Sequence, residues 1–314
     1  MTAKASNGTR LPVVAPTEQR DVAGSDLDLL PTLDLLRRIN AEDAVVPSAV
    51  EQALPELARV VDLAVAALQA GRNVHYFGAG TSGRMAAMDA AELVPTFDLE
   101  PGRVVAHPAG GMQALDAAVE GVEDDAASGR AAADGLVAGD VALGLAASGR
   151  TPYVAGALEQ ARSVGASTVL VSANPAAELA DLADIHVCVE TGPEVLTGST
   201  RMKAGTAQKL VLTAFSTAVM VRLGRTYSNL MTSVVAKNEK LHGRMLAILA
   251  EATGVDLDGC ARALEEADGD LKVALVGLLG EVEQPRARAA LAASGGVVRV
   301  ALQSLDHAPG VTQA

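Results

Sequence analysis

Short apolar runs alternate with helical patterns through the middle of the chain. Apolar runs followed by patterns of helical periodicity are typical of a parallel sheet that helices cover on both faces. We therefore predict an α/β fold with five parallel strands. The predicted strands are residues 74–77, 104–106, 141–146, 168–172 and 185–190.

The helical patterns lie before, between and after these strands. In residues 48–70 apolar side chains return every three or four positions, and Gly71 is a plausible end of that helix. The other predicted helices are residues 29–40, 84–93, 112–129, 153–164, 203–223 and 234–249, and then short helices in 252–302 broken at Gly254, Gly269, Gly280 and Gly295.

Three parts of the chain differ in their patterns. Residues 1–25 are polar and punctuated by Pro and Gly, so we expect them to be loosely ordered or wrapped over a neighbour. The predicted domains are residues 1–45 as an N-terminal arm and helix, 46–230 as the α/β domain, and 231–314 as a C-terminal helical module.

Composition limits the partners of this chain. Its 314 residues are 49% hydrophobic but only 2% aromatic, so the core is built from Ala, Val and Leu. The net charge of −13, with no cluster of Lys and Arg, disfavours nucleic acid. The longest apolar-rich stretch, residues 210–221, is too short to span a bilayer, so we predict no membrane partner.

Cysteine and histidine usage points away from metal sites and disulfides. Cys188 and Cys260 form no CxxC pair, and the five histidines show no HExxH spacing. Residues 1–18 lack the continuous apolar run of a secretory signal. We therefore expect a cytoplasmic protein without a metal or another cofactor.

A glycine-rich loop follows the first predicted strand. Gly78, Gly80 and Gly83 match the GxGxxG spacing of dinucleotide sites, and Thr81 and Ser82 between them supply hydroxyl groups. A dinucleotide site also needs an acidic residue at the end of the second strand. The second strand runs instead into His-Pro-Ala-Gly-Gly, so a nicotinamide cofactor is disfavoured.

Two more hydroxyl-rich loops follow later strands, at 148–151 and 197–201. Ser and Thr are ordinary N-caps, so one such loop could be purely structural. Three at the carboxyl edge of one sheet, each before a helix N-terminus, suit a phosphate monoester. The sequence therefore favours a phosphate-monoester site over a dinucleotide site.

Two glutamates are candidates for acid–base chemistry. Glu92 lies among Ala and Leu on the helix after the first loop, and we expect it to be buried enough to act as an acid or base. Glu120 and Glu123 share a helix face by their spacing, and periodicity does not choose between them.

Residues 18–302 resemble the N-acetylmuramic acid 6-phosphate etherases, lyases of the sugar isomerase (SIS) superfamily. The matching phrases begin with 77–84 (FGAGTSGR) and 89–92 (DAAE). They continue with 118–124, 146–153 and 229–231, the four residues from Asn238 to Leu241, and above all the run at 192–209.

The resemblance implies a flavodoxin-like sheet, a helical C-terminal module and a homodimer. It implies cleavage of N-acetylmuramate 6-phosphate with water to N-acetylglucosamine 6-phosphate and D-lactate. Glu92 then corresponds to the acid that protonates the departing lactate, and Glu123, not Glu120, to the second active-site glutamate. The expected substrate-binding residues are Gly80, Thr81, Ser82, Ser148, Gly149, Arg150, Thr151, Ser199, Thr200 and Lys203.

Two departures and two alternatives accompany this resemblance. Ala91, Leu93 and Val94 replace the commoner Ser, Cys and Pro around Glu92, and Met-Ala-Ala after Arg84 replaces a more usual Leu-Gly. The alternative from another class is a sugar-phosphate-binding regulator of the glucokinase-regulator type. An aldose–ketose isomerase of the same superfamily is the third possibility. Residues 238–240 are candidates for contacts with a partner subunit's site.

Overall fold

The computed structural model describes residues 15–21, 26–234 and 239–306. They form two compact units, each built from separate stretches of the chain. The first contains the chain up to Leu57, His75–Ala86 and His107–Val211. The second contains Ala58–Val74, Ala87–Ala106 and the chain from Leu212 onward. Among the described residues, none of the helices has the length and apolar character needed to cross a bilayer.

The five predicted strands form one sheet with the strand order β2-β1-β3-β4-β5. The register of β3 to β4 pairs Val141 with Ser167, and that of β4 to β5 pairs Val169 with Ile185; both pairs are parallel. This order is that of flavodoxin-like sheets, so the predicted fold class is confirmed. The strands are β1 (Val74–Gly78), β2 (Val104–Pro108), β3 (Val141–Leu145), β4 (Ser167–Ser172) and β5 (Ile185–Cys188).

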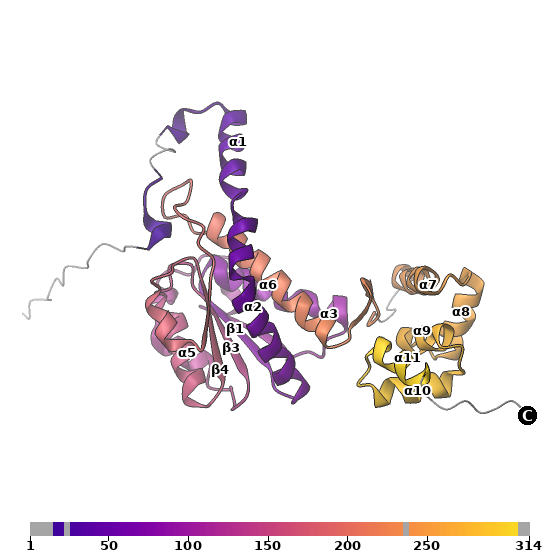
Figure 1. Cartoon of the computed structure of the whole chain (residues 1–314). Coiled ribbons are helices and arrows are strands. Elements are labelled where there is room, and N and C mark those ends of the chain that lie inside the picture. The colour runs from indigo at the N-terminus through magenta and orange to yellow at the C-terminus, as the bar shows by residue number, and fades with distance from the viewer. Residues whose placement is uncertain (1–14, 22–25, 235–238, 307–314) are drawn as a thin grey trace, which may run out of the picture. The chain divides into compact units, whose positions relative to one another are not determined.

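Long helices flank the strands, and α5 packs on β3 and β4 (Figure 1). Its residues Val154 and Leu158 are fully buried against the sheet residue Leu170. α1, in contrast, buries none of its residues. The helices up to the end of the α/β part are α1 (Thr32–Asp43), α2 (Val46–Gln69), α3 (Thr81–Phe97), α4 (Ala126–Ala132), α5 (Pro152–Ser163) and α6 (Lys203–Arg222).

The predicted helix over residues 112–129 is wrong. This stretch forms two 3-10 turns, Met112–Leu115 and Val122–Asp124, and only then α4. Gly121 has a φ of 76°, a left-handed conformation that ends any helix running through it. Asp125 caps α4 by accepting a hydrogen bond from the Ser128 N–H at 3.0 Å, which fixes the helix start.

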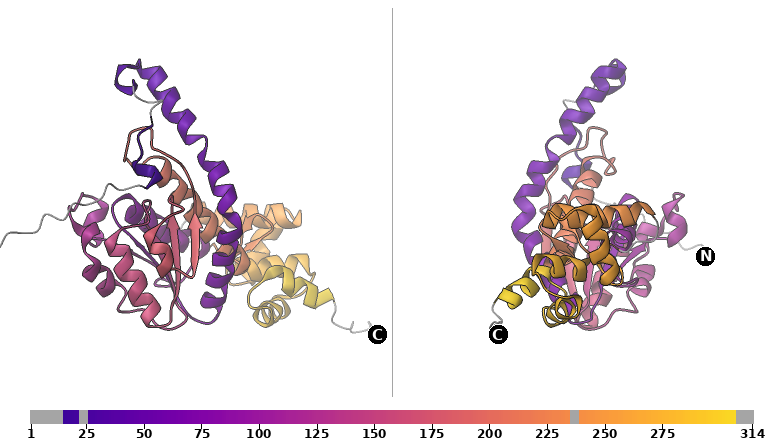
Figure 2. Two further views of the ribbon diagram at one scale, coloured as in Figure 1. Left: turned by 60° about the vertical axis from the view of Figure 1, so that its left-hand side comes forward. Right: turned by 90° about the vertical axis from the view of Figure 1, so that its right-hand side faces the viewer.

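Between residues 239 and 306, five helices lie together in the second unit (Figure 2). Their buried residues form one core. Leu249, Ala274 and Val298 from three of them are fully buried there. The predicted breaks at the four glycines of this region are confirmed, whereas the β6–β7 hairpin (Thr226–Tyr227 and Leu230–Met231) was not predicted. The helices are α7 (Glu239–Thr253), α8 (Leu257–Glu266), α9 (Leu271–Leu279), α10 (Gln284–Ala293) and α11 (Val298–Asp306).

Candidate functional site

A polar cavity of about 240 Å³ lies in the first unit at the carboxyl ends of β1 and β3. It brings together all three hydroxyl-bearing loops that the sequence pattern singled out. A glutamate from the 3-10 turn before α4 and another from the N-terminal arm join them. The lining residues are Glu18, Ala79, Gly80, Thr81, Ser82, Glu123, Ala147, Ser148, Thr151 and Thr200.

Two helices begin at this cavity. α3 starts at Thr81, and α5 starts at Pro152 directly after Thr151. Thr151 occupies the N-cap position of α5, but its side chain makes no capping hydrogen bond. Its hydroxyl group therefore serves no helix cap and is free to meet a ligand. Helix N-termini with adjacent hydroxyl groups form a favourable environment for a phosphate.

The third loop contributes less to the cavity because its helix N-terminus already has a carboxylate partner. Glu194 is fully buried and accepts hydrogen bonds from the N–H groups of Lys203 at 2.9 Å and Ala204 at 3.0 Å. Burial raises the pKa of the Glu194 carboxyl, and the two N–H groups oppose that rise. Of the predicted residues in this loop, Thr200 lines the cavity and Ser199 does not.

Two predicted cations pair with acids instead of lining the cavity. The Lys203 ammonium lies 2.8 Å from Glu42, and the Arg150 guanidinium lies 2.9 Å from Glu178. Gly149 is buried and is not among the lining residues either. Among its described lining residues the cavity therefore presents hydroxyl groups and two carboxylates, but no cationic side chain.

The family comparisons agree with this architecture. A model described as "SIS domain" matches residues 119–218, and one described as "Glucokinase regulatory protein N-terminal SIS domain" matches residues 56–162. An N-acetylmuramic acid 6-phosphate etherase from Thermobifida fusca is 64% identical over 267 residues, which cover 85% of this chain and 88% of the relative. The chain belongs to the N-acetylmuramic acid 6-phosphate etherase family.

Other members of the etherase family match just as broadly. The etherase from Cutibacterium acnes is 51% identical over 92% of this chain and 96% of its own length. That from Streptomyces coelicolor is 49% identical over 88% of this chain and 90% of its own. A solved phosphoheptose isomerase from Francisella tularensis is 17% identical with a TM-score of 0.46, covering 60% of this chain and 98% of that one.

In the stretch 89–92 that resembles the etherase family, the buried acid is Asp89 rather than Glu92. Asp89 accepts a hydrogen bond from the Ser216 hydroxyl at 2.9 Å, within the second unit. α3 buries Asp89, Leu93 and Phe97 at helical spacing, and Glu92 falls on the exposed side. The expectation that Glu92 is buried in this chain is therefore wrong.

Sequence reasoning missed three lining residues, Ala79, Ala147 and Glu18, of which Glu18 alone has a polar side chain. It lies in a polar stretch expected to be loosely ordered, yet its neighbours Ala15 and Thr17 are almost completely buried. Within this polar stretch, the triplet Pro-Thr-Glu at 16–18 indicated local order, and in the structure it forms a 3-10 turn.

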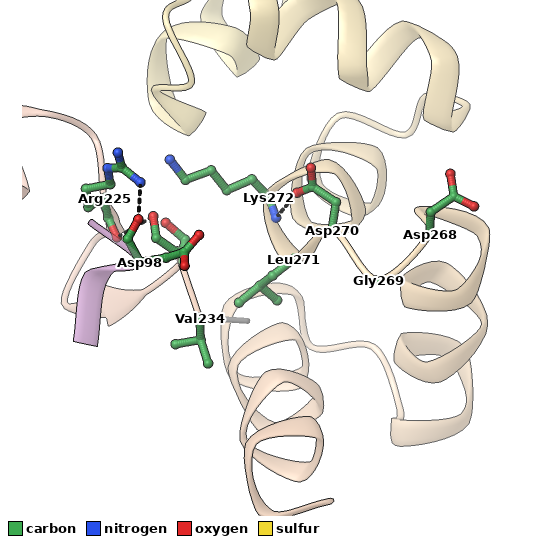
Figure 3. Close-up of a pocket in the computed structure, with 10 residues that line it drawn as sticks. Asp98, Arg225, Val234, Asp268, Gly269, Asp270, Leu271 and Lys272 are labelled. Atoms are coloured by element: carbon green, nitrogen blue, oxygen red, sulfur yellow. Dashed lines mark hydrogen bonds between the residues drawn. The ribbon is translucent and has the colours of Figure 1, made fainter. Parts of the chain in front are cut away.

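A second cavity, of about 350 Å³, lies in the other unit (Figure 3). Its cations already have partners: Lys272 donates to the carbonyls of Gly224 at 2.7 Å and Gly296 at 2.9 Å, and Arg225 to that of Asp98 at 3.3 Å. Burial lowers the pKa of Lys272 to about 8. None of the residues predicted for the etherase site lines this cavity, so the first one is the candidate site.

The described part of the chain offers no metal centre. Within it, no group of three or more His, Cys, Asp or Glu side chains is placed to bind a metal ion. Cys188 and Cys260 are both free thiols.

Proposed function

We propose that this chain cleaves the D-lactyl ether of N-acetylmuramic acid 6-phosphate with water. The products are N-acetylglucosamine 6-phosphate and D-lactate, and the enzyme is a carbon–oxygen lyase. The observation that carries this proposal is the 64% identity to an etherase over 85% of the chain. The cavity adds support, because it joins the hydroxyl loops to a glutamate that corresponds to an active-site residue in the family.

In this proposal the phosphate binds where α3 and α5 begin. Thr81, Ser82, Ser148 and Thr151 supply hydroxyl groups there, and the helix N-termini stabilise the negative charge. The phosphate does not react. Its binding energy positions the reacting carbons of the sugar relative to the glutamates.

The chemistry needs two carboxyl groups in opposite protonation states. In the open-chain sugar the C1 aldehyde acidifies the C2 proton, and the ionised Glu123 carboxylate removes it. The electron pair left at C2 forms the C2–C3 double bond as the C3–O bond breaks. By the family resemblance, Glu92, which is not among the cavity's lining residues, gives its proton to the departing lactate oxygen. Water then adds its hydroxyl to C3 and a proton returns to C2, so the sum is hydrolysis of the ether.

One assay tests the proposal directly. The full chain is incubated with N-acetylmuramic acid 6-phosphate, and D-lactate is measured with a coupled dehydrogenase. Stoichiometric release of D-lactate and N-acetylglucosamine 6-phosphate is the expected result. Tight binding of the sugar phosphate without lactate would reject the lyase activity.

A sugar-phosphate-binding regulator is the second candidate, because the glucokinase-regulator SIS model matches residues 56–162. That match covers about a third of the 314 residues, whereas the etherase relatives align over 85–92% of the chain. The lactate assay separates the two candidates, since a regulator binds the sugar phosphate and leaves its ether intact.

The proposal includes a homodimer. Leu29, Leu33 and Leu36 recur every three or four residues at the start of α1 and just before it, and they are 79%, 57% and 57% exposed. Exposed leucines of this kind, two on α1 and one in the 3-10 turn before it, are suited to packing against a second copy. Light scattering coupled to gel filtration should give twice the chain mass of 31.8 kDa, and Leu33→Asp together with Leu36→Asp should give the monomer.

The proposal also keeps the expected setting and domain roles. The enzyme works in the cytoplasm, in amino sugar catabolism or the recycling of peptidoglycan. Residues 46–230 carry the sugar-phosphate site, after an N-terminal arm and helix in 1–45 and before a helical module in 231–314. Of residues 238–240, considered for contacts with a partner subunit, Asn238 lies outside the described residues.

A further inference from the structure

The N-terminal arm places one carboxylate in the candidate site. Glu18 lines the cavity together with the hydroxyl loops and Glu123, although more than sixty residues separate it from the first loop. No Lys or Arg belongs to the described lining, so the two glutamates are its only ionisable side chains.

The arm is anchored on both sides of Glu18. Ala15 is 1% and Thr17 is 0% exposed, so the residues just before Glu18 are packed into the first unit. The Glu18 N–H donates to the Ala15 carbonyl at 2.9 Å and closes a 3-10 turn that starts at Pro16. Further along, Asp21 forms a 3.0 Å ion pair with Arg38 of α1. The backbone at Glu18 is therefore held by packed residues, while the Glu18 side chain itself is exposed at the cavity.

The third loop approaches the Glu18 carboxylate closely. A Cβ atom added at Gly198 would lie 3.1 Å from Glu18 Oε2. Gly198 also has a φ of 74°, a conformation that glycine adopts without strain. The loop that carries Thr200 therefore has a glycine, Gly198, at the position that lies next to the Glu18 carboxylate.

Charge decides which part of a sugar phosphate meets Glu18. A carboxylate repels a phosphate dianion, so the phosphate belongs at the helix N-termini and the glutamates face the sugar. Carboxylate oxygens accept hydrogen bonds from hydroxyl groups, and such charge-assisted bonds are strong and directional. We propose that Glu18 binds hydroxyl groups of the sugar and makes the site select a sugar phosphate over phosphate itself.

This inference rests on the proposed sugar-phosphate site, and binding measurements test it without turnover. Titration calorimetry compares N-acetylglucosamine 6-phosphate and inorganic phosphate on the full chain and on Glu18→Ala. We expect Glu18→Ala to bind N-acetylglucosamine 6-phosphate with a Kd at least tenfold higher than that of the wild-type chain. The Kd for inorganic phosphate should stay the same or become tighter, because a negative charge leaves the cavity. Glu18→Gln keeps one acceptor oxygen and should lose less affinity than Glu18→Ala.

The outcomes separate a binding role from a structural one. Equal weakening of both ligands would show that Glu18 only supports the loops, and unchanged sugar-phosphate binding would show that it does not touch the sugar; either overturns the inference. Glu51→Ala, on the exposed side of α2, is the matched control and should leave both Kd values unchanged. Thermal melting checks that each variant is folded. Wild-type binding of the sugar phosphate without lactate release would reject the lyase and leave the Glu18 test intact.

Discussion

The Nζ atom of Lys203 lies 2.8 Å from Oε2 of Glu42, and the Lys203 side chain is only 4% exposed. This ion pair joins the last turn of α1 to the first residue of α6. The Nε atom of Arg38 lies 3.5 Å from Oε1 of Glu42, so the network of ion pairs extends along α1. Lys203, which lies within the most specific family motif at 192–209, therefore has a partner inside the first unit.

Replacing Glu42 with Gln should destabilise the protein because it removes the ion-pair partner of the buried Lys203 ammonium. Removing one partner of a buried pair costs about 3–5 kcal/mol, and Glu42 is partly exposed, so we expect the lower end, about 3 kcal/mol. Urea denaturation measures the free energy of unfolding. Glu51→Gln, at an exposed position of α2, should change it by less than about 0.5 kcal/mol. Equal values for both variants would argue against the pair.

Glu194 offers a second stability prediction at the same helix. Its carboxylate accepts the N–H groups of Lys203 and Ala204 while fully buried. Glu194→Ala leaves both N–H groups without a partner and should lower the free energy of unfolding by about 2 kcal/mol. Glu194→Gln keeps an acceptor oxygen and should lose less in the same denaturation experiment. An alanine variant as stable as the wild type would contradict the capping role.

The sheet could be predicted from sequence because its strands are short buried runs. Every residue of β1 and β3 is buried, so the apolar pattern located these strands to within about a residue. Residues 112–129 lack such a pattern. There the outcome depended on the left-handed Gly121 and on the Asp125 cap, which periodicity does not report.

The loops of the candidate site could be predicted from the sequence, but the partners of its charged residues could not. The hydroxyl residues follow strands, and the topology of a parallel sheet brings strand ends together. The Lys203–Glu42 and Arg150–Glu178 ion pairs and the presence of Glu18 at the cavity join stretches far apart in sequence, and the Glu194 cap spans nine residues of irregular loop. No local pattern specifies such contacts, so they needed the structure.

Gly149 should resist substitution for two reasons that a control can separate. Its φ is 70°, and a Cβ atom there would lie 2.2 Å from the Cβ of Ala177. Gly71 has a φ of 75° but nothing within 4 Å of an added Cβ. Gly71→Ala should therefore lower the free energy of unfolding only through backbone strain, by about 1–2 kcal/mol. Gly149→Ala should lower it by clearly more, because the new Cβ also meets Ala177. Thermal or urea denaturation compares the two, and similar losses would refute the close contact.

Two neighbouring histidines, the buried His75 and the half-buried His107, should make the fold sensitive to acid. His75 Nδ1 and His107 Nε2 lie 3.0 Å apart, and the His107 ring stacks on Phe77. Burial, with a smaller effect from His75, lowers the pKa of His107 to about 4, and burial lowers that of His75 as well. Because the pKa of each histidine is lower in the folded than in the unfolded protein, the neutral rings favour the folded state fully above about pH 6.5. This stabilisation is lost as the pH falls towards 4.

The loss attributable to His107 should reach about 3 kcal/mol, because each pKa unit corresponds to about 1.36 kcal/mol. Urea denaturation between pH 7 and pH 4.5 measures it. His107→Gln should flatten the profile, whereas the exposed His242 can be replaced by Gln without effect on it. If His107→Gln and the wild type lost stability in parallel, the histidine pair would not be the cause.

Glu123 and Glu120 provide a matched pair for testing the proposed C2 base. Both are exposed residues three positions apart, but only Glu123 lines the cavity. In deuterated water, an active base removes the C2 proton and deuterium replaces it, which nuclear magnetic resonance detects in the sugar phosphate. Glu123→Gln should abolish this exchange and slow lactate release by about 10²- to 10⁴-fold, the usual contribution of a general base. Glu120→Gln should keep both rates within twofold. Full C2 exchange in Glu123→Gln would mean that another group removes the proton.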